Sequence, residues 1–133
     1  KTGGNKIMKK TFLKPFVVIC LTLVIATIAV ANVVLNPPSP PQAPNVNLKT
    51  ATLCEITYKA PIDDGGSPIV SYEIESFNFD TAKWTSRGSS TTLSHEVSMP
   101  KYTKTKFRIS ALNSVGRSHP VETKEITFSD LAR

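Results

Sequence analysis

Residues 60–72 read APIDDGGSPIVSY, so that a polar turn leads into alternating apolar and polar residues. The two glycines tolerate the positive φ of a tight turn, and the aspartates before them can accept hydrogen bonds from backbone N–H groups two residues on. Beyond the turn, Tyr72 and Ile74 would point to one side of a strand over residues 69–76, and the residues between them to the other. The stretch therefore predicts a turn followed by a half-buried β-strand.

The same alternation recurs along the chain after residue 44, with turn signals at short intervals and no window of helical period. It predicts a short strand that carries Trp84 and longer strands over residues 52–58, 91–98, 106–113 and 121–128. The inward side chains expected in the longer strands are Cys54, Ile56, Tyr58, Leu93, His95, Val97, Phe107, Ile109, Ala111, Ile126 and Phe128. Many short strands with frequent turns favour an all-β sandwich.

Three features of the sequence carry a resemblance to a known family. They are the DGGSPI turn that begins at Asp64, Trp84 after the next turn, and the stretch FRISALNSVG over residues 107–116. From about Pro44 to Phe128 the chain resembles a fibronectin type III module, as found in giant muscle proteins and in many exported proteins. The resemblance implies an all-β, immunoglobulin-like sandwich of seven strands. It also implies binding or spacing rather than catalysis.

Two positions depart from the family's pattern. Tyr58 stands where the family usually has a tryptophan on its second strand, and Thr105 stands where it has a corner tyrosine. A threonine is too short for the long reach of that tyrosine, whose hydroxyl bonds the backbone a few residues upstream. Tyr102, in the loop before it, is the alternative residue for this role.

The net charge of +6 belongs to the N-terminal part of the chain. Five lysines precede residue 15, and the other 11 basic residues nearly balance the 10 acidic ones. A nucleic-acid-binding domain needs a cationic face on its folded part. The composition therefore gives no reason to expect nucleic acid as a partner.

Neither a catalytic site nor a metal site is predicted. His95 falls in an expected strand and His119 in an expected loop, with no nucleophile and orienting group beside them. The adjacent carboxylates of Asp63 and Asp64 lack the further oxygen ligands that calcium requires, and no three or four ligands have zinc spacing. We therefore expect no enzyme activity, no cofactor and no small-molecule substrate.

The two cysteines are expected to be free thiols. Cys20 lies inside an apolar run, whereas Cys54 lies on the inward side of an expected strand. A residue in a membrane and a residue in a domain core cannot form a disulfide with each other. Packing is the commoner role of a buried free cysteine.

An uncharged apolar run extends from Phe16 to Leu35, behind a basic flank over residues 1–15. As a helix, the run would be ~30 Å long, about the thickness of a bilayer's hydrocarbon core. We expect an uncleaved single-pass anchor in contact with the lipid bilayer. The alternative is a signal peptide that starts at Met8 and is cleaved after Ala31, which would release a secreted protein.

The basic flank also predicts the orientation of the chain. Lysines precede the apolar run and no basic residue follows it before Lys49, so the positive-inside rule places the N-terminus on the cis side. The rest of the chain would lie on the extracytoplasmic or lumenal side. It would consist of a proline-rich, polyproline-type spacer over residues 36–44, a domain over 45–129 and a tail over 130–133.

The outward residues of two strands give a candidate partner surface. In the family's sheet order, the strand with Glu73 and Glu75 pairs with the strand that follows residue 105, so opposite charges would face each other. One interpretation is a solvated ladder of ion pairs. The other is a basic stripe that docks an acidic protein partner. The residues of this surface are Lys101, Lys104, Lys106, Arg108, Glu73 and Glu75.

Taken with the anchor, these features predict a non-catalytic protein-interaction module that is tethered to a membrane. It would act as an accessory or scaffolding subunit of a larger membrane assembly. A secreted or cell-surface adhesion module is the first alternative, and a passive spacer is the second.

Overall fold

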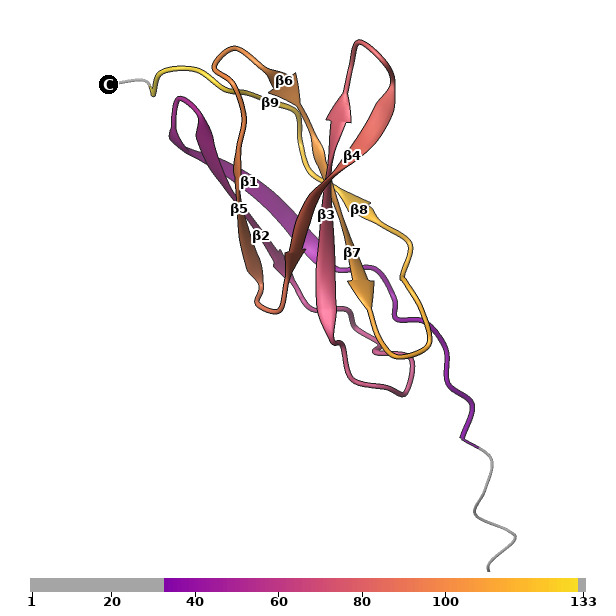
Figure 1. The fold of residues 1–133 in the computed structure, drawn as a ribbon. Helices are drawn as coiled ribbons and strands as arrows, with labels where there is room; N and C mark the ends of the chain where they lie inside the picture. The colour runs from indigo at the N-terminus through magenta and orange to yellow at the C-terminus, as the bar shows by residue number, and fades with distance from the viewer. Residues whose placement is uncertain (1–32, 132–133) are drawn as a thin grey trace, which may run out of the picture. The chain divides into compact units, whose positions relative to one another are not determined.

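The computed structural model describes residues 33–131, which form nine β-strands (Figure 1). The strands are β1 (Gln42–Thr50), β2 (Leu53–Lys59), β3 (Ser71–Asn78), β4 (Lys83–Ser90), β5 (Ser94–Ser98), β6 (Lys104–Thr105), β7 (Phe107–Leu112), β8 (Val121–Glu122) and β9 (Ile126–Thr127). Within this described range, no helix is long and apolar enough to cross a membrane.

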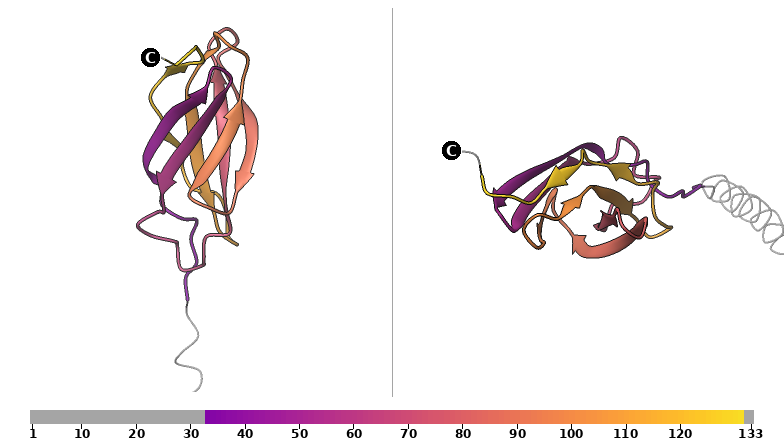
Figure 2. Two further views of the ribbon diagram at one scale, coloured as in Figure 1. Left: turned by 90° about the vertical axis from the view of Figure 1, so that its left-hand side faces the viewer. Right: turned by 90° about the horizontal axis from the view of Figure 1, so that it is seen from above.

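The strands form two facing layers (Figures 1 and 2). One layer is a three-stranded sheet in the order β1-β2-β5, and the other is a four-stranded sheet in the order β4-β3-β7-β8. The pairings within both sheets are antiparallel, as is the separate pairing of β6 with β9. The all-β sandwich expected from the alternation is confirmed.

The number of strands differs from the expected seven because the end of the chain is more divided than the alternation suggests. The expected strand over residues 121–128 is split into β8 and β9, and these pair with different strands, β7 and β6. Thr123, between them, is buried, and its Oγ1 accepts the N–H of Phe107 at 3.0 Å. A side chain therefore supplies a hydrogen bond where a continuous ladder would use a backbone carbonyl.

The core lies between the two layers, where the inward residues of both sheets meet. Its buried apolar side chains are Cys54, Ile56, Tyr58, Tyr72, Ile74, Val97, Phe107, Ile109, Ala111 and Phe128. Tyr58 and Tyr72 join the layers, with ring centroids 4.8 Å apart, and the Tyr58 hydroxyl donates to the carbonyl of Thr92 at 2.8 Å. The predicted inward sides of β2, β3 and β7 are thus confirmed.

The core thiol of Cys54 is free, as expected. Burial raises its pKa to about 11, because a thiolate would lose its hydration there. The group is therefore a protonated, small apolar side chain at neutral pH. The expectation for Cys20 lies outside the described residues.

One inward side chain of the strand expected over residues 91–98 is wrong. Leu93, expected inside, is 47% exposed, because the strand expected over residues 91–98 begins only at Ser94. His95 is half-buried, and its Nε2 shares a hydrogen bond with the carbonyl of Arg87 at 2.8 Å. His95 pairs with the buried Ile56, so it lies on the inner side of β5 as expected, and its ring bonds the backbone of β4 in the other sheet.

The corner position is filled by Thr105 alone. This residue is fully buried, and its Oγ1 donates to the carbonyl of Phe77 at 2.8 Å. Tyr102, considered as a substitute for the corner tyrosine, is 73% exposed and does not take that role. Its bond joins β3, 28 residues away in sequence, and not the backbone a few residues upstream that a corner tyrosine bonds.

The proline-rich segment, expected to be a spacer over residues 36–44, lies against the domain. We call residues 34–40 the strap. The N–H of Asn36 donates to the carbonyl of Gly65, and the N–H of Ser39 donates to that of Asp63, both at 2.9 Å. Prolines have no N–H to donate, so these two bonds come from Asn36, which precedes the prolines, and from Ser39, which lies between them. Pro41, the first residue after the strap, is buried, and β1 follows at once.

The expected membrane or signal helix over residues 16–35 is described only at its C-terminal end. Residues 33–35 are not helical, and the side chains of Val33 and Val34 are largely exposed. The expected helix therefore does not reach Leu35. The expectation for residues 16–32 lies outside the described part of the chain.

Replacing Phe107 with alanine is expected to lower the free energy of unfolding by about 3–5 kcal/mol, because it empties a fully buried ring site. Urea denaturation of the full chain measures this change. The matched control is Phe79→Ala, since Phe79 is 40% exposed and its loss should cost far less. Equal losses for the two variants would contradict the assigned core.

Candidate functional site

The candidate site is the outer face of the four-stranded sheet. In β3, Tyr72 and Ile74 point into the core, so Glu73, Glu75 and Phe77 point outward. The register of the sheet sets the neighbours of these residues, pairing Glu75 with Arg108 of β7 and Phe77 with Trp84 of β4. Residues from three strands therefore meet on one surface.

The predicted pairing of β3 glutamates with β7 cations is present. Both oxygens of the Glu75 carboxylate accept hydrogen bonds from Arg108, from Nε and from Nη2, each at 3.1 Å. Arg117, from the loop before β8, pairs with Glu73 and lies 3.8 Å from Glu75. The side chain of Glu75 is only 17% exposed, so this two-point contact is partly shielded from solvent.

The other three predicted cations are paired with carboxylates that the sequence reasoning had not considered. Lys106 lies 2.6 Å from Glu122, Lys104 lies 3.2 Å from Glu125, and Lys101 lies 2.6 Å from Asp130. The hydrogen bond that Lys101 donates to the Asp130 carboxylate raises the pKa of its ammonium group. The expected excess of basic residues over two glutamates is thus offset by carboxylates from the C-terminal segment. Lys101 lies in the loop before β6, apart from the sheet face.

Aromatic rings lie beneath these cations. Phe77 is in contact with both Phe79 and Trp84, at centroid distances of 4.9 and 5.0 Å. The Arg108 guanidinium lies 4.4 Å from the centroid of the Trp84 ring, and Lys106 lies 5.2 Å from that of Phe77. These distances are typical of cation–π contacts.

We call this set the cation–aromatic ladder: Lys104, Lys106, Arg108, Phe79, Phe77 and Trp84. Each of its cations lies close to an aromatic ring as well as to a carboxylate, with Lys104 5.2 Å from the centroid of Phe79. Sequence reasoning identified the cations and missed the rings. Phe77 and Phe79 follow Glu75 at intervals of two residues, and this spacing predicts that both rings lie on the same side of the strand as Glu75.

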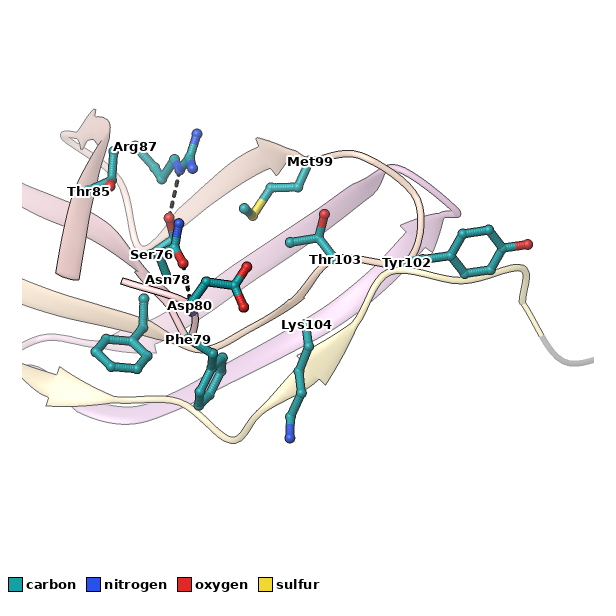
Figure 3. A pocket seen from close by; sticks show the side chains of 11 residues that line it. Ser76, Asn78, Phe79, Asp80, Thr85, Arg87, Met99, Tyr102, Thr103 and Lys104 are labelled. Carbon is teal, nitrogen blue, oxygen red and sulfur yellow. Dashed lines mark hydrogen bonds between the residues drawn. The ribbon is translucent and has the colours of Figure 1, made fainter. Parts of the chain in front are cut away.

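A cavity of 510 Å³ opens beside the ladder, near the β3–β4 turn (Figure 3). Phe79 and Tyr102 line it from different segments, and Arg87 reaches it from β4. Nε of Arg87 donates to Oγ of the buried Ser76 at 2.7 Å. Because Asp80 lies in the same lining, the cavity carries both signs of charge.

The residues considered for metal binding are engaged in a turn. Oδ1 of Asp63 accepts the N–H of Gly65, and Oδ1 of Asp64 accepts the N–H of Gly66, both at 2.8 Å. Between residues 33 and 131 no three histidine, cysteine or acidic side chains gather in a group that could hold a metal ion. The turn interpretation accounts for both aspartates.

No family model matches the chain. Domains A168–A170 from titin superpose with a TM-score of 0.68 at 25% identity, covering 71% of this chain and 33% of that one. The twitchin kinase region from C. elegans gives a TM-score of 0.67 at 25% identity, covering 71% of this chain and 17% of that one. A solution structure of the fourth FNIII domain of a human protein gives 0.63 at 22% identity, covering 78% and 90%.

The domain has the fibronectin type III fold. The expectation drawn from the sequence resemblance is therefore confirmed for the fold. The chain spans a third or less of the titin and twitchin chains that it matches. The similarity to the twitchin region is to its fibronectin type III domain and not to its kinase.

The contact between Arg108 and Glu75 is expected to stabilise this domain. A double-mutant cycle with Arg108→Gln and Glu75→Gln should give a coupling energy of about 1 kcal/mol, at the upper end for such pairs because the geometry is bidentate and partly shielded. Urea denaturation in low salt measures it.

The control cycle uses Lys104→Gln and Glu125→Gln, whose side chains are 57% and 52% exposed. Its coupling should be smaller and should fall further as salt is added. If the control pair has a coupling energy as large as that of Arg108 and Glu75, partial shielding from solvent does not strengthen the Arg108–Glu75 contact.

Proposed function

We propose that the chain is a non-catalytic protein-interaction module, tethered to a membrane, that serves as an accessory or scaffolding subunit of a larger membrane assembly. Fibronectin type III domains generally mediate protein interactions. The docking surface in this proposal is the outer face of the four-stranded sheet, which holds the cation–aromatic ladder.

The composition of the ladder carries the proposal. Tryptophan and arginine are the residues most enriched among those that dominate protein–protein binding energy, and here Arg108 lies over the Trp84 ring. The carboxylate of Glu75 holds that arginine in place from the other strand. A partner would therefore meet side chains that are already ordered, which lowers the entropic cost of binding.

The charges of the face suggest how it would select a partner. The ion pairs balance its cations, so a uniformly acidic protein gains little from long-range attraction. A mixed surface instead favours a partner whose own charges match the pattern at close range, while mismatched partners bring like charges together. In place of the acidic partner suggested by the sequence, we therefore propose a partner surface of mixed charge with an apolar centre.

The membrane part of the proposal rests on the sequence. The uncharged run from Phe16 to Leu35 and the lysines before it favour a single-pass anchor, with the domain on the extracytoplasmic or lumenal side. The alternative is a secreted or cell-surface adhesion module, which is favoured by the sequence Ala29-Val30-Ala31 at a suitable distance for signal-peptide cleavage.

The ladder proposal is tested by isolating the tagged full chain from its native membranes in mild detergent and quantifying the proteins that accompany it. Trp84→Ala should reduce recovery of a specific partner by about tenfold or more, because truncating an aromatic hot spot costs about 2 kcal/mol or more. Reversing both Lys104 and Lys106 to glutamate should also reduce it, most strongly at low salt.

The matched control for the charge reversal is Lys59→Glu, at the exposed end of β2 in the other sheet. It should leave the partner bound. If Trp84→Ala and the reversal of Lys104 and Lys106 keep their partner at low salt, the ladder is not the docking surface. If the native chain has no stable partner, the passive spacer is the better description.

Membrane tethering is tested separately by carbonate extraction. The full chain is expected to stay in the membrane pellet, because an apolar helix of ~20 residues resists extraction. Mass spectrometry of the mature protein gives the N-terminus directly. A soluble species that begins at Asn32 would replace the anchor with a cleaved signal peptide.

A further inference from the structure

The strap contacts two loops that lie at the same end of the domain (Figures 1 and 2). Besides the bonds from the backbone N–H groups of Asn36 and Ser39, Oγ of Ser39 accepts the N–H of Asp63 at 3.1 Å. Asp63 and Gly65 belong to the loop between β2 and β3. The side chain of Asn113 links this loop to the one between β7 and β8, and the hydroxyls of Ser67 and Ser114 share a second hydrogen bond between the loops at 2.8 Å.

Asn113 is 6% exposed, and its amide group is fully used. Nδ2 donates to the carbonyls of Asn36 and Asp64, both at 2.8 Å, while Oδ1 accepts the N–H groups of Val115 and Gly116. Two donors and two acceptors are the whole capacity of this side chain. One buried residue thus connects the strap with both loops.

Little else holds the strap. Pro38 is its only buried residue, and Leu35 and Val34 are 44% and 76% exposed. The strap belongs to no strand, whereas Pro41, directly after it, is buried. Segments with few buried apolar contacts open at a much lower free energy than the core to which they are attached.

We infer that the strap is a latch that opens without unfolding the rest of the domain. When closed, it covers Asn113 and Gly65 and fixes the chain to the loop end. When open, it exposes both loops and frees residues 36–40, which lengthens the chain before Pro41 by up to roughly 17 Å at full extension. The inference does not depend on the proposed function, because it concerns the loop end of the domain and not the outer face of the four-stranded sheet.

Two adjacent glycines provide a matched pair of variants. Gly65 and Gly66 have φ of +77° and +88°, so an alanine at either position has a similar backbone cost. A Cβ at Gly65 would lie 1.9 Å from the carbonyl oxygen of Asn36, in the backbone of the strap. A Cβ at Gly66 would meet the flexible end of the Leu35 side chain at 3.2 Å and would lie at an ordinary contact distance of 3.6 Å from the carbonyl oxygen of Val34.

Amide hydrogen exchange of the full chain, followed by NMR, distinguishes the two states. The reporters are the amides of Asn36 and Ser39, and the reference is the amide of Phe77, which donates to the carbonyl of Lys106. In the native chain the reporters should exchange at least about tenfold faster than the reference, yet slower than an unprotected amide. Gly65→Ala should abolish their protection and leave Phe77 unchanged relative to Gly66→Ala.

Asn113→Asp provides a second variant in case Gly65→Ala disturbs the loop itself. It keeps the acceptor for Val115 and Gly116 and removes the donors to Asn36 and Asp64, so the reporters should again lose protection while Phe77 keeps it. Reporters that exchange at the rate of Phe77 in the native chain would overturn the latch, because the strap would then open only with global unfolding. Equal reporter rates in Gly65→Ala and Gly66→Ala would overturn it as well.

Discussion

The antiparallel pairing of β3 with β7 is the constraint on which the rest of the domain depends. It aligns Ile74 with Ile109 and Glu75 with Arg108 in one register. The first pair is buried in the core and the second lies on the outer face. Because side chains alternate along a strand, a slip of one residue would exchange the two faces, burying charged groups and exposing the isoleucines. The core and the candidate site are therefore specified by the same pairing.

The outer face shows how a near-neutral surface is built from many charges. Its cations come from β6, β7 and the residue between them, its rings from β3, β4 and their connection, and its carboxylates from β3 and the C-terminal segment. Exposed ion pairs contribute little stability by themselves. Holding Arg108 between a ring and a carboxylate restricts its rotamers before any partner arrives, and so favours binding more than folding.

Alternation and turn chemistry were enough to predict the sandwich and the inward faces of β2, β3 and β7, whereas the expectation that glutamates of β3 face cations of β7 came from the sheet order of the resembled family. Alternation and turn chemistry were not enough for β1, whose mostly polar and half-exposed residues give a weak period of two. The partners of Lys104 and Lys106 were missed for a different reason. Glu122 lies in β8 and Glu125 lies just before β9, and nothing local predicts which strand each short segment joins.

The strap was the largest departure, and its cause is also non-local. Its proline content is typical of an extended spacer, and only the loops around Asp63 and Asn113 convert it into a bound segment. Asn36 and Asn113 are 77 residues apart, so this contact forms between one of the first parts of the domain to be synthesised and one of the last. Contacts of such long range close late in folding. During synthesis the loop around Asp63 is available to the strap early, whereas its contact with Asn113 can form only after β7 has emerged, so the segment that precedes the domain is fully bound only when the domain is nearly complete.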